Sequence, residues 1–228
     1  MSHTYLLAGA SSEIAIETAK ILTKQGNKVI ALSTRSYNDN YDEFYQIEKY
    51  ENDYFPKLDE NLDGLIYFPG TINLKPFHRF NKQDFINDYE INALGAVLFV
   101  QQYLNNLKNS SVASIVFMSS VAAKKGMPFH ASIAMAKCAI EGLTRSLAAE
   151  LAPKIRVNAV APSLTQTALA DRFLNTPEKL EASKKRNPMK KIGTINEVSE
   201  AIHFLLSERS SWITGQVLSV DGGMSTLA

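Results

Sequence analysis

The amino-acid sequence predicts an α/β fold: a doubly wound parallel sheet with helices on both faces. Between residues 5 and 32, a short apolar strand, a glycine turn, an amphipathic helix and a second apolar strand follow one another. A further strand and helix are predicted within residues 114–152, and another apolar strand begins near residue 155. Strands that alternate with helices in this way are typical of parallel sheets whose crossovers cover both faces.

Composition restricts the functional classes. The 228 residues suffice for one α/β domain over residues 1–228, with 45% hydrophobic residues and a formal net charge of +1. A net charge this small does not indicate a nucleic-acid-binding surface. No run approaches the roughly 18 apolar residues of a membrane helix. The single cysteine and an amino terminus without a basic, apolar leader favour a cytoplasmic location. We expect no metal site.

The N-terminal elements predict a βαβ unit. Residues 5–8 form the first expected strand, and Gly9 follows its carboxyl end. Apolar residues at helical spacing predict a helix over residues 14–25, with Gly26 just after its end. Residues 28–32 predict the second strand. A dinucleotide-binding turn requires this setting, because N–H groups at a helix N-terminus stabilise a pyrophosphate.

The stretch from residue 38 to residue 63 is strongly acidic, with nine carboxylate side chains against two lysines. It has no long helical periodicity, so we expect only a short strand near residues 45–48 and a helical turn near residues 54–58. A solvated acidic flank explains this charge better than a binding surface does. Residues 63–70 then predict a strand that runs into a loop.

Helical patterns account for much of the remaining chain. The predicted helices cover residues 82–107, 131–152 and 196–206, and the predicted strands lie within residues 114–118, 155–162 and 212–223. Residues 168–191 contain a basic cluster and are expected to form a mobile cover, or lid, over the substrate. We expect this cluster to be a solvated face of the cover, although it would also attract an acidic substrate or carrier protein.

The carboxyl end of the strand at residues 114–118 is where chemistry is expected. Ser119 and Ser120 follow this strand, and Lys137 lies on the second turn of the next predicted helix. Ligands of open α/β sheets bind at the carboxyl ends of strands. A hydroxyl at the strand end therefore faces an ammonium group across a candidate ligand site.

These residues resemble the catalytic segment of the short-chain dehydrogenase/reductase family. In that family a serine stands thirteen residues before a tyrosine, and a lysine follows as Y-x-x-x-K; Ser120 and Lys137 have this spacing, but residue 133 is isoleucine. Residues 156–163 are similar to the family's R-V-N-x-x-x-P-G segment, and residues 213–223 match its closing I-T-G-Q-x-x-x-V-D-G-G. The resemblance implies a Rossmann-like sheet of about seven strands in the order 3-2-1-4-5-6-7, shortened around strand three.

The resemblance also implies roles for individual residues. Ser120 would bind the substrate oxygen, Lys137 would hold the nicotinamide ribose, and Asn92 would link the lysine to solvent. The implied cofactor-binding residues are Gly9, Ser11, Ser12, Ile14, Arg35, Gly70, Lys137, Pro162 and Thr167. Ser33 stands where an acidic residue would bind the ribose of NAD, and Arg35 lies two residues on, so NADP is the expected cofactor, with NAD possible.

Three residues depart from the family pattern at this one site. Ile133 replaces the proton-donating tyrosine, Glu13 replaces a glycine of the T-G-x-x-x-G-x-G turn, and Pro69 lies where the family has N-N-A-G. Glu13 would have to point away from a pyrophosphate. A positioned general acid contributes roughly 10²–10⁴-fold to a rate. The candidate replacements are His130, one turn before Ile133, and Lys137 acting through water.

Two functions follow from these observations. The first is an NAD(P)-dependent oxidoreductase that transfers hydride between NADP(H) and a small carbonyl or hydroxyl compound, with an atypical proton donor. The second is a catalytically silent relative that binds a dinucleotide, or none, and acts as a regulatory or scaffold protein. The resemblance further implies a homodimer or homotetramer, and we expect neither nucleic acid nor membrane as a partner.

Overall fold

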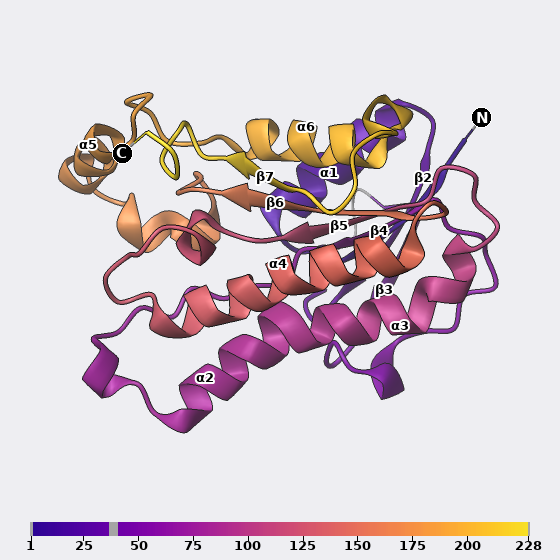
Figure 1. The fold of residues 1–228 in the computed structure, drawn as a ribbon, viewed down its shortest axis with the longest axis horizontal. Helices are drawn as coiled ribbons and strands as arrows, with labels where there is room; N and C mark the ends of the chain where they lie inside the picture. Colours follow the sequence, from indigo (N-terminus) through magenta and orange to yellow (C-terminus); the bar gives the residue numbers. More distant parts are fainter. Residues whose placement is uncertain (1, 37–40, 228) are drawn as a thin grey trace.

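A seven-stranded parallel sheet organises the chain, of which the computed structural model describes residues 2–36 and 41–227 (Figure 1). Its strands are β1 (Thr4–Ala8), β2 (Lys28–Ser33), β3 (Glu43–Gln46), β4 (Gly64–Tyr67), β5 (Ser114–Met118), β6 (Arg156–Pro162) and β7 (Val217–Val220). The order is β3-β2-β1-β4-β5-β6-β7, as predicted. The chain runs outward from β1 to β3 and returns to β4 beside β1, and this reversal opens a crevice at the carboxyl ends of the strands.

Helices cover both faces of the sheet. They are α1 (Glu13–Lys24), α2 (Lys82–Tyr89), α3 (Gly95–Leu107), α4 (Ala131–Leu151), α5 (Pro177–Arg186) and α6 (Ile195–Leu206). In Figure 1, α1 and α6 lie on one face, and α2, α3 and α4 on the other. Successive strand residues point to opposite faces, so Leu6 belongs to the core under α3 and α4, and Leu7 to the core under α1 and α6. None of the helices described is long and apolar enough to cross a bilayer.

Capping explains where α1 begins and ends. The Oγ atom of Ser12 accepts a hydrogen bond from the backbone N–H of Ala15 at 3.2 Å, so the helix starts one residue before the apolar pattern does. Gly26 follows the helix with a φ angle of +81°, which glycine adopts without strain. The bounds of α4 and α6 are likewise within one residue of the predicted ones.

The predicted helix over residues 82–107 contains an irregularity. Helices α2 and α3 are joined by a π-helical turn, Glu90–Leu94, which holds Asn92 at its centre. Such turns release backbone carbonyls from the regular ladder, and they occur frequently at functional sites. Asn92 therefore lies at the irregular point of this helical segment.

The acidic stretch differs from its prediction in detail. The strand β3 covers Glu43–Gln46 rather than residues 45–48, and the helical turn is a short 3₁₀ turn at Asn52–Tyr54 rather than at residues 54–58. Lys28 of β2 contacts both ends of this stretch, because its Nζ atom lies 2.5 Å from carboxylate oxygens of both Glu43 and Glu60. Residues 41–63 contain no α-helix, only this short 3₁₀ turn, which agrees with the predicted shortening around strand three. Residues 38–40 of the acidic stretch lie outside the described residues.

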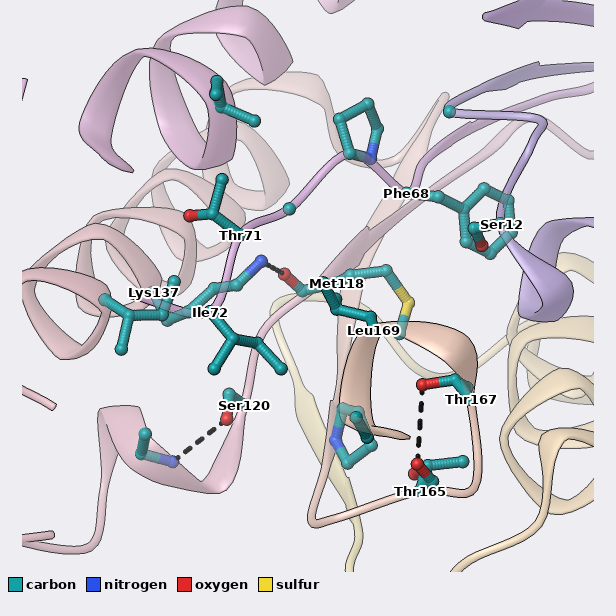
Figure 2. Close-up of a pocket in the computed structure, with 18 of the residues that line it drawn as sticks. Ser12, Phe68, Thr71, Ile72, Met118, Ser120, Lys137, Thr165, Thr167 and Leu169 are labelled. Atoms are coloured by element: carbon teal, nitrogen blue, oxygen red, sulfur yellow. Dashed lines mark hydrogen bonds between the residues drawn. The ribbon is translucent and has the colours of Figure 1, made fainter. Parts of the chain in front are cut away.

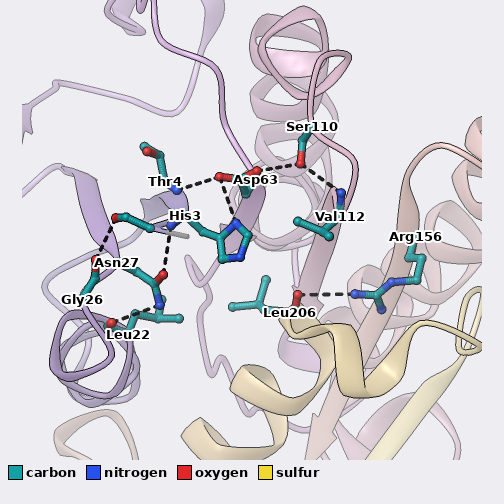
Figure 3. Close-up of polar contacts among 11 residues, drawn as sticks. His3, Thr4, Leu22, Gly26, Asn27, Asp63, Ser110, Val112, Arg156 and Leu206 are labelled. Carbon is teal, nitrogen blue, oxygen red and sulfur yellow. Dashed lines mark hydrogen bonds and ion pairs between the residues drawn. The ribbon is translucent and has the colours of Figure 1, made fainter.

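Polar contacts hold the amino ends of the strands, opposite the crevice (Figure 3). Asp63 accepts hydrogen bonds from the Thr4 backbone N–H at 2.8 Å and from the Ser110 hydroxyl at 2.6 Å. Arg156, at the start of β6, donates to backbone carbonyls at the end of α6, including that of Leu205 at 2.9 Å. The R-V-N motif is therefore structural here, and the carboxyl ends of the strands are left for a ligand.

Candidate active site

A groove of about 1800 Å³ runs along the carboxyl ends of the central strands. The turn after β1, the loop after β4, the end of β5, the start of α4 and the segment after β6 contribute its walls. Ten of the predicted site residues line it: Gly9, Ser11, Ser12, Ile14, Arg35, Gly70, Ser120, Lys137, Pro162 and Thr167. Asn92 lies behind the wall, with 1% of its surface exposed. The structure thus brings the predicted site together from distant parts of the chain.

The turn after β1 depends on a contact between Gly9 and Pro69. Gly9 has a φ angle of +79°, and a Cβ atom at this position would lie 2.7 Å from the Cδ atom of Pro69. Glycine is therefore required both for the backbone conformation and for the close approach of the proline ring. Pro69 is a departure from the family pattern, but here it packs onto the turn without displacing it.

Glu13, the other departure in this turn, reaches across the groove. Its Oε2 atom accepts a hydrogen bond from the backbone N–H of Ala168 at 2.6 Å. Ala168 begins a 3₁₀ helix, Ala168–Phe173, in the expected cover, residues 168–191. The expectation that Glu13 points away is therefore incomplete, because its carboxylate lines the groove and binds the opposite side.

Lys137 is the buried cation of the site. Its Nζ atom donates a hydrogen bond to the carbonyl oxygen of Met118, the last residue of β5, at 2.8 Å (Figure 2). Burial lowers the pKa of Lys137 from 10.5 to about 8, although the nearby charge of Asp88 opposes this shift. An amine with such a pKa exchanges its proton near neutral pH, as a general acid or base must.

A polar network lies behind Lys137. Asn92 donates through Nδ2 to the hydroxyl of Thr71 and to the carbonyl of Asp88, both at 2.8 Å. The Thr71 hydroxyl in turn donates to the carboxylate of Asp88 at 2.6 Å, and the hydroxyl of Ser132 donates to the other carboxylate oxygen. Asp88 is buried, so these donors supply the stabilisation that water would otherwise give. The carbonyl that Asn92 uses belongs to Asp88 in the last turn of α2, four residues earlier.

Gly70 separates this network from the groove. A Cβ atom on Gly70 would lie 3.2 Å from the Oδ1 atom of Asn92 and 3.4 Å from the Nζ atom of Lys137. The two side chains therefore approach the same backbone from two different helical segments. No direct hydrogen bond joins the two side chains, and the link between Asn92 and Lys137 stays a prediction.

The groups around residue 133 differ in their access to the groove. Ile133 is buried in the first turn of α4 and lines the groove. Ser120 accepts a hydrogen bond from the Ala122 backbone N–H at 3.2 Å, which leaves its own proton free to donate. His130 is half-buried just before the start of α4 and also lines the groove, and its Nδ1 atom lies 2.7 Å from the Pro128 carbonyl.

Thr167 and Arg172 form hydrogen bonds at the start of the cover segment. The Thr167 hydroxyl donates to the Thr165 carbonyl at 3.5 Å, as Figure 2 shows. Arg172 donates to the carbonyl of Ile72, in the loop after β4. With Ala168 bound to Glu13, the 3₁₀ helix of the cover is thus held on two sides of the groove.

The acidic stretch also reaches the groove, at the end of β2. Tyr50 lines it, and burial raises the pKa of its phenol, while hydrogen-bond donors of Thr34, Ser33 and Gly9 around the hydroxyl oppose that rise. The Tyr41 hydroxyl donates to the Ala10 carbonyl at 2.5 Å. Most of the described acidic side chains of this stretch are exposed, as expected of a solvated flank, whereas its tyrosines support the turn after β1.

Sequence reasoning missed three contributors: Asp88, Thr71 and Tyr50. Asp88 precedes Asn92 by four residues on one helical face, a spacing that does indicate neighbouring side chains. Thr71 and Tyr50 lie in irregular segments, where no periodicity indicates the direction of a side chain. Their positions follow only from the folded chain.

Comparison with known proteins agrees with this geometry. Residues 42–225 match the protein family described as enoyl-(acyl carrier protein) reductase. The chain is 31% identical over 233 residues to a 3-oxoacyl-[acyl-carrier-protein] reductase of Rickettsia prowazekii, which covers 97% of this chain and 96% of that protein. It is 38% identical to a tropinone reductase homolog of Arabidopsis thaliana over 74% of this chain and 63% of the relative, so it spans less than two thirds of that relative's length.

Solved structures show the same architecture. A ligand-free aldohexose dehydrogenase of Thermoplasma acidophilum matches with a TM-score of 0.90 and 26% identity, over 100% of this chain and 95% of that one. The structure described as ElxO with NADP bound matches with a TM-score of 0.87 and 27% identity, over 98% of this chain and 99% of that one. These relatives support an NAD(P)-dependent oxidoreductase activity. The chain belongs to the short-chain dehydrogenase/reductase family.

Proposed function

We propose that this protein is an NADP(H)-dependent reductase of small carbonyl compounds in which Lys137 supplies the proton. The observation that carries the proposal is a buried ammonium group at the carboxyl end of β5, on the wall of the dinucleotide groove. The serine that would bind a substrate oxygen and the lysine are both present, and the family tyrosine is absent. Lys137 therefore has to combine cofactor binding with proton donation.

In one half of the groove, the residues present fit the nicotinamide end of a dinucleotide. Gly70 leaves space between the backbone and the side chains of Asn92 and Lys137, which a Cβ atom would take up. Lys137 would hold the nicotinamide ribose, and Thr167 and Pro162 would hold the nicotinamide. A reduced nicotinamide supplies a hydride when it is bound there. In the other half, Ser11, Ser12 and the N-terminus of α1 would face the pyrophosphate, and Glu13 stands among them.

Reduction of a carbonyl group needs an oxygen-binding donor and a proton source. The Ser120 hydroxyl donates to the substrate oxygen, since its own acceptor role is already met by the Ala122 N–H. As hydride adds to the carbonyl carbon, the π-electron pair moves to the oxygen and a proton is taken up there. Lys137 gives this proton, directly or through water, and becomes a neutral amine. Solvent then restores the ammonium.

Lys137 is a better proton donor than His130. Burial lowers the pKa of Lys137 to about 8, which places its proton transfer near neutral pH. His130 is half-buried and also lines the groove, but its ring is engaged with the Pro128 carbonyl before the helix begins. The buried amine also lies beside the nicotinamide half of the groove, where the reaction would occur.

The preference for NADP rests on Arg35. Its exposed side chain lines the groove just beyond the end of β2, where the family binds the ribose of the adenosine half. A guanidinium group pairs with a phosphate through two parallel hydrogen bonds. Glu51 and Asp53 line the same end of the groove and oppose a 2′-phosphate, so NADH is the necessary comparison.

A second function is favoured by Glu13. A carboxylate at the N-terminus of α1 repels a pyrophosphate, and the tie to Ala168 narrows the entry. A catalytically silent relative that acts through a partner protein would retain the fold with such a closed site. The missing tyrosine is consistent with this alternative.

A fluorescence titration of the purified protein with NADPH, and separately with NADH, tests the proposal. Saturable binding at micromolar concentration, tighter for NADPH, is the expected result. Tighter binding of NADH would reject the role of Arg35 alone. If neither nucleotide binds up to millimolar concentration, the enzyme function is rejected in favour of the silent relative.

The variant Ile133→Tyr tests the remaining machinery. Ile133 is buried at the groove wall in the first turn of α4, where the family's tyrosine would be. Restored reductase activity on simple ketones would show that the other catalytic groups are sound. An inert variant that still binds NADPH would place the defect elsewhere in the site.

We also propose a homodimer or homotetramer, as the family resemblance implies, and a cytoplasmic location, which the single cysteine favours. Light scattering coupled to size-exclusion chromatography distinguishes these states from a monomer of 25.3 kDa.

A further inference from the structure

We infer that Glu13 is an internal competitor for the dinucleotide: its carboxylate holds the backbone N–H of Ala168 and must release it before a pyrophosphate can bind. The inference rests on the proposed function and concerns how that site opens. It assigns a role to a residue that replaces glycine in the nucleotide-binding turn.

The contact is well placed for this role. Glu13 is the first residue of α1, and Ala168 is the first residue of the 3₁₀ helix in the cover segment, residues 168–191. Their hydrogen bond is 2.6 Å long and joins positions 155 residues apart in the chain. Both residues line the groove. The contact therefore joins two walls of the groove, the turn after β1 and the cover.

The chemistry of the two partners explains the competition. A backbone N–H bound to a carboxylate forms a charge-assisted hydrogen bond, which is stronger than one between neutral groups. The same N–H, and the free N–H groups at the start of α1, are suited to a phosphate oxygen. A carboxylate oxygen and a phosphate oxygen are both anionic acceptors, so they cannot share these donors without repulsion. The carboxylate of Glu13 thus occupies an N–H donor that a phosphate oxygen of the ligand would use.

The cover has a second hydrogen bond to the groove wall, so breaking the bond between Glu13 and Ala168 would free only one edge of the 3₁₀ helix. Arg172 donates to the carbonyl of Ile72, so the 3₁₀ helix stays attached to the loop after β4 when Ala168 leaves Glu13. Glu13 itself is exposed and rotates away without disturbing the core. Opening therefore requires one side chain and the edge of one short helix to move.

The variants Glu13→Gln and Glu13→Ala separate charge from contact. The first keeps an acceptor oxygen but removes the charge, and the second removes both. Glu17→Gln is the matched control, because it makes the same charge change one turn later on α1, where Glu17 lies beside Lys20 rather than the cover. NADPH and NADH titrations of all four proteins measure affinity. Hydrogen exchange of a peptide spanning residues 165–173, without ligand, measures the tie.

We expect at least a roughly 10-fold lower Kd for NADPH in Glu13→Gln and a larger decrease in Glu13→Ala, because each charge-assisted bond lost is worth about that factor. The Kd of Glu17→Gln should stay within about 2-fold of the unmodified chain, since surface charges one turn away are screened. Exchange at residues 165–173 should become faster in Glu13→Ala and stay unchanged in Glu17→Gln.

The outcomes separate the inference from the proposed function. If the unmodified chain binds NADPH and both Glu13 variants bind it equally well, the competitor role is rejected while the enzyme function stands. If no variant binds a nucleotide, the proposed function fails and the competition fails with it. Unchanged exchange in Glu13→Ala would show that the carboxylate does not hold the cover, and this result would also overturn the inference.

Discussion

The ammonium group of Lys137 donates to the carbonyl oxygen of Met118 at 2.8 Å, inside the wall of the groove. One neutral acceptor does not compensate for the hydration that the cation loses, so burial lowers the pKa of Lys137 to about 8. The charge of Asp88 nearby keeps the pKa from falling further. The site therefore holds a cation that is close to losing its proton. Three predictions concern this cation and its surroundings, and a fourth concerns Arg156.

Replacing Lys137 by methionine should stabilise the fold at neutral pH. The pKa of Lys137 is 10.5 unfolded and about 8 folded, so the unfolded chain binds more protons between these values and stability rises with pH across that window. The advantage of Lys137→Met should therefore shrink by roughly 3 kcal/mol between pH 8 and 10.5. Urea unfolding of both proteins across this range measures the difference.

Tyrosine side chains titrate in the same pH range, and their contribution to stability must be the same in both proteins for this comparison. Burial raises the pKa of Tyr5 to about 12, so its contribution to stability falls as pH rises above 10, but equally in both proteins. A difference between the two proteins that does not change with pH would show that Lys137 is not perturbed by burial.

Removing the charge of Asp88 should shift the pH dependence of reduction. Asp88 raises the pKa of Lys137, so Asp88→Asn should move the alkaline limb of the rate profile from about pH 8 to lower pH. The profile of kcat/KM against pH measures this shift once a substrate is known. Ser132→Ala is the control, since it removes a hydrogen-bond donor of Asp88 but no charge. Equal shifts in both variants would assign the effect to packing instead.

A methyl group at Gly70 should disturb the nicotinamide half of the site. The added Cβ atom would crowd the Oδ1 atom of Asn92 and the Nζ atom of Lys137 at 3.2 and 3.4 Å. We expect a loss of roughly 1–2 kcal/mol in stability and at least a 10-fold higher Kd for NADPH. Gly126→Ala, where no heavy atom lies within 4 Å of the new Cβ, is the control for both measurements. Similar losses in the two variants would contradict the role of Gly70.

Arg156 should matter for stability and not for ligand binding. Its guanidinium group donates to the carbonyls of Leu205 and Ser207 and to the hydroxyl of Ser210. Arg156→Met removes several donors from the end of α6 and should cost roughly 2–3 kcal/mol. Thermal unfolding measures this loss. Arg209→Met, which loses only a cation–π contact to Phe204, should cost less than about 1 kcal/mol.

The order of the sheet was predictable because the resemblance to the short-chain dehydrogenase/reductase family implies it. Apolar strands, capped helices and Gly9 are local patterns, and the alternation of strand and helix leaves few ways to pack them. The acidic stretch was less predictable, since contacts such as the ion pairs of Lys28 with Glu43 and Glu60 join residues that are distant in sequence.

The sequence by itself predicted the family, the strand order and ten of the residues that line the groove, from Gly9 to Thr167. Only the tertiary structure decided what those residues face. The hydrogen bonds of Asp88 with Thr71 and Ser132, and the reach of Glu13 to Ala168, join segments that no local pattern relates. The physical reason is that periodicity encodes burial and secondary structure, whereas pKa shifts and hydrogen-bond partners arise from groups that become neighbours only when the sheet and its helices have packed.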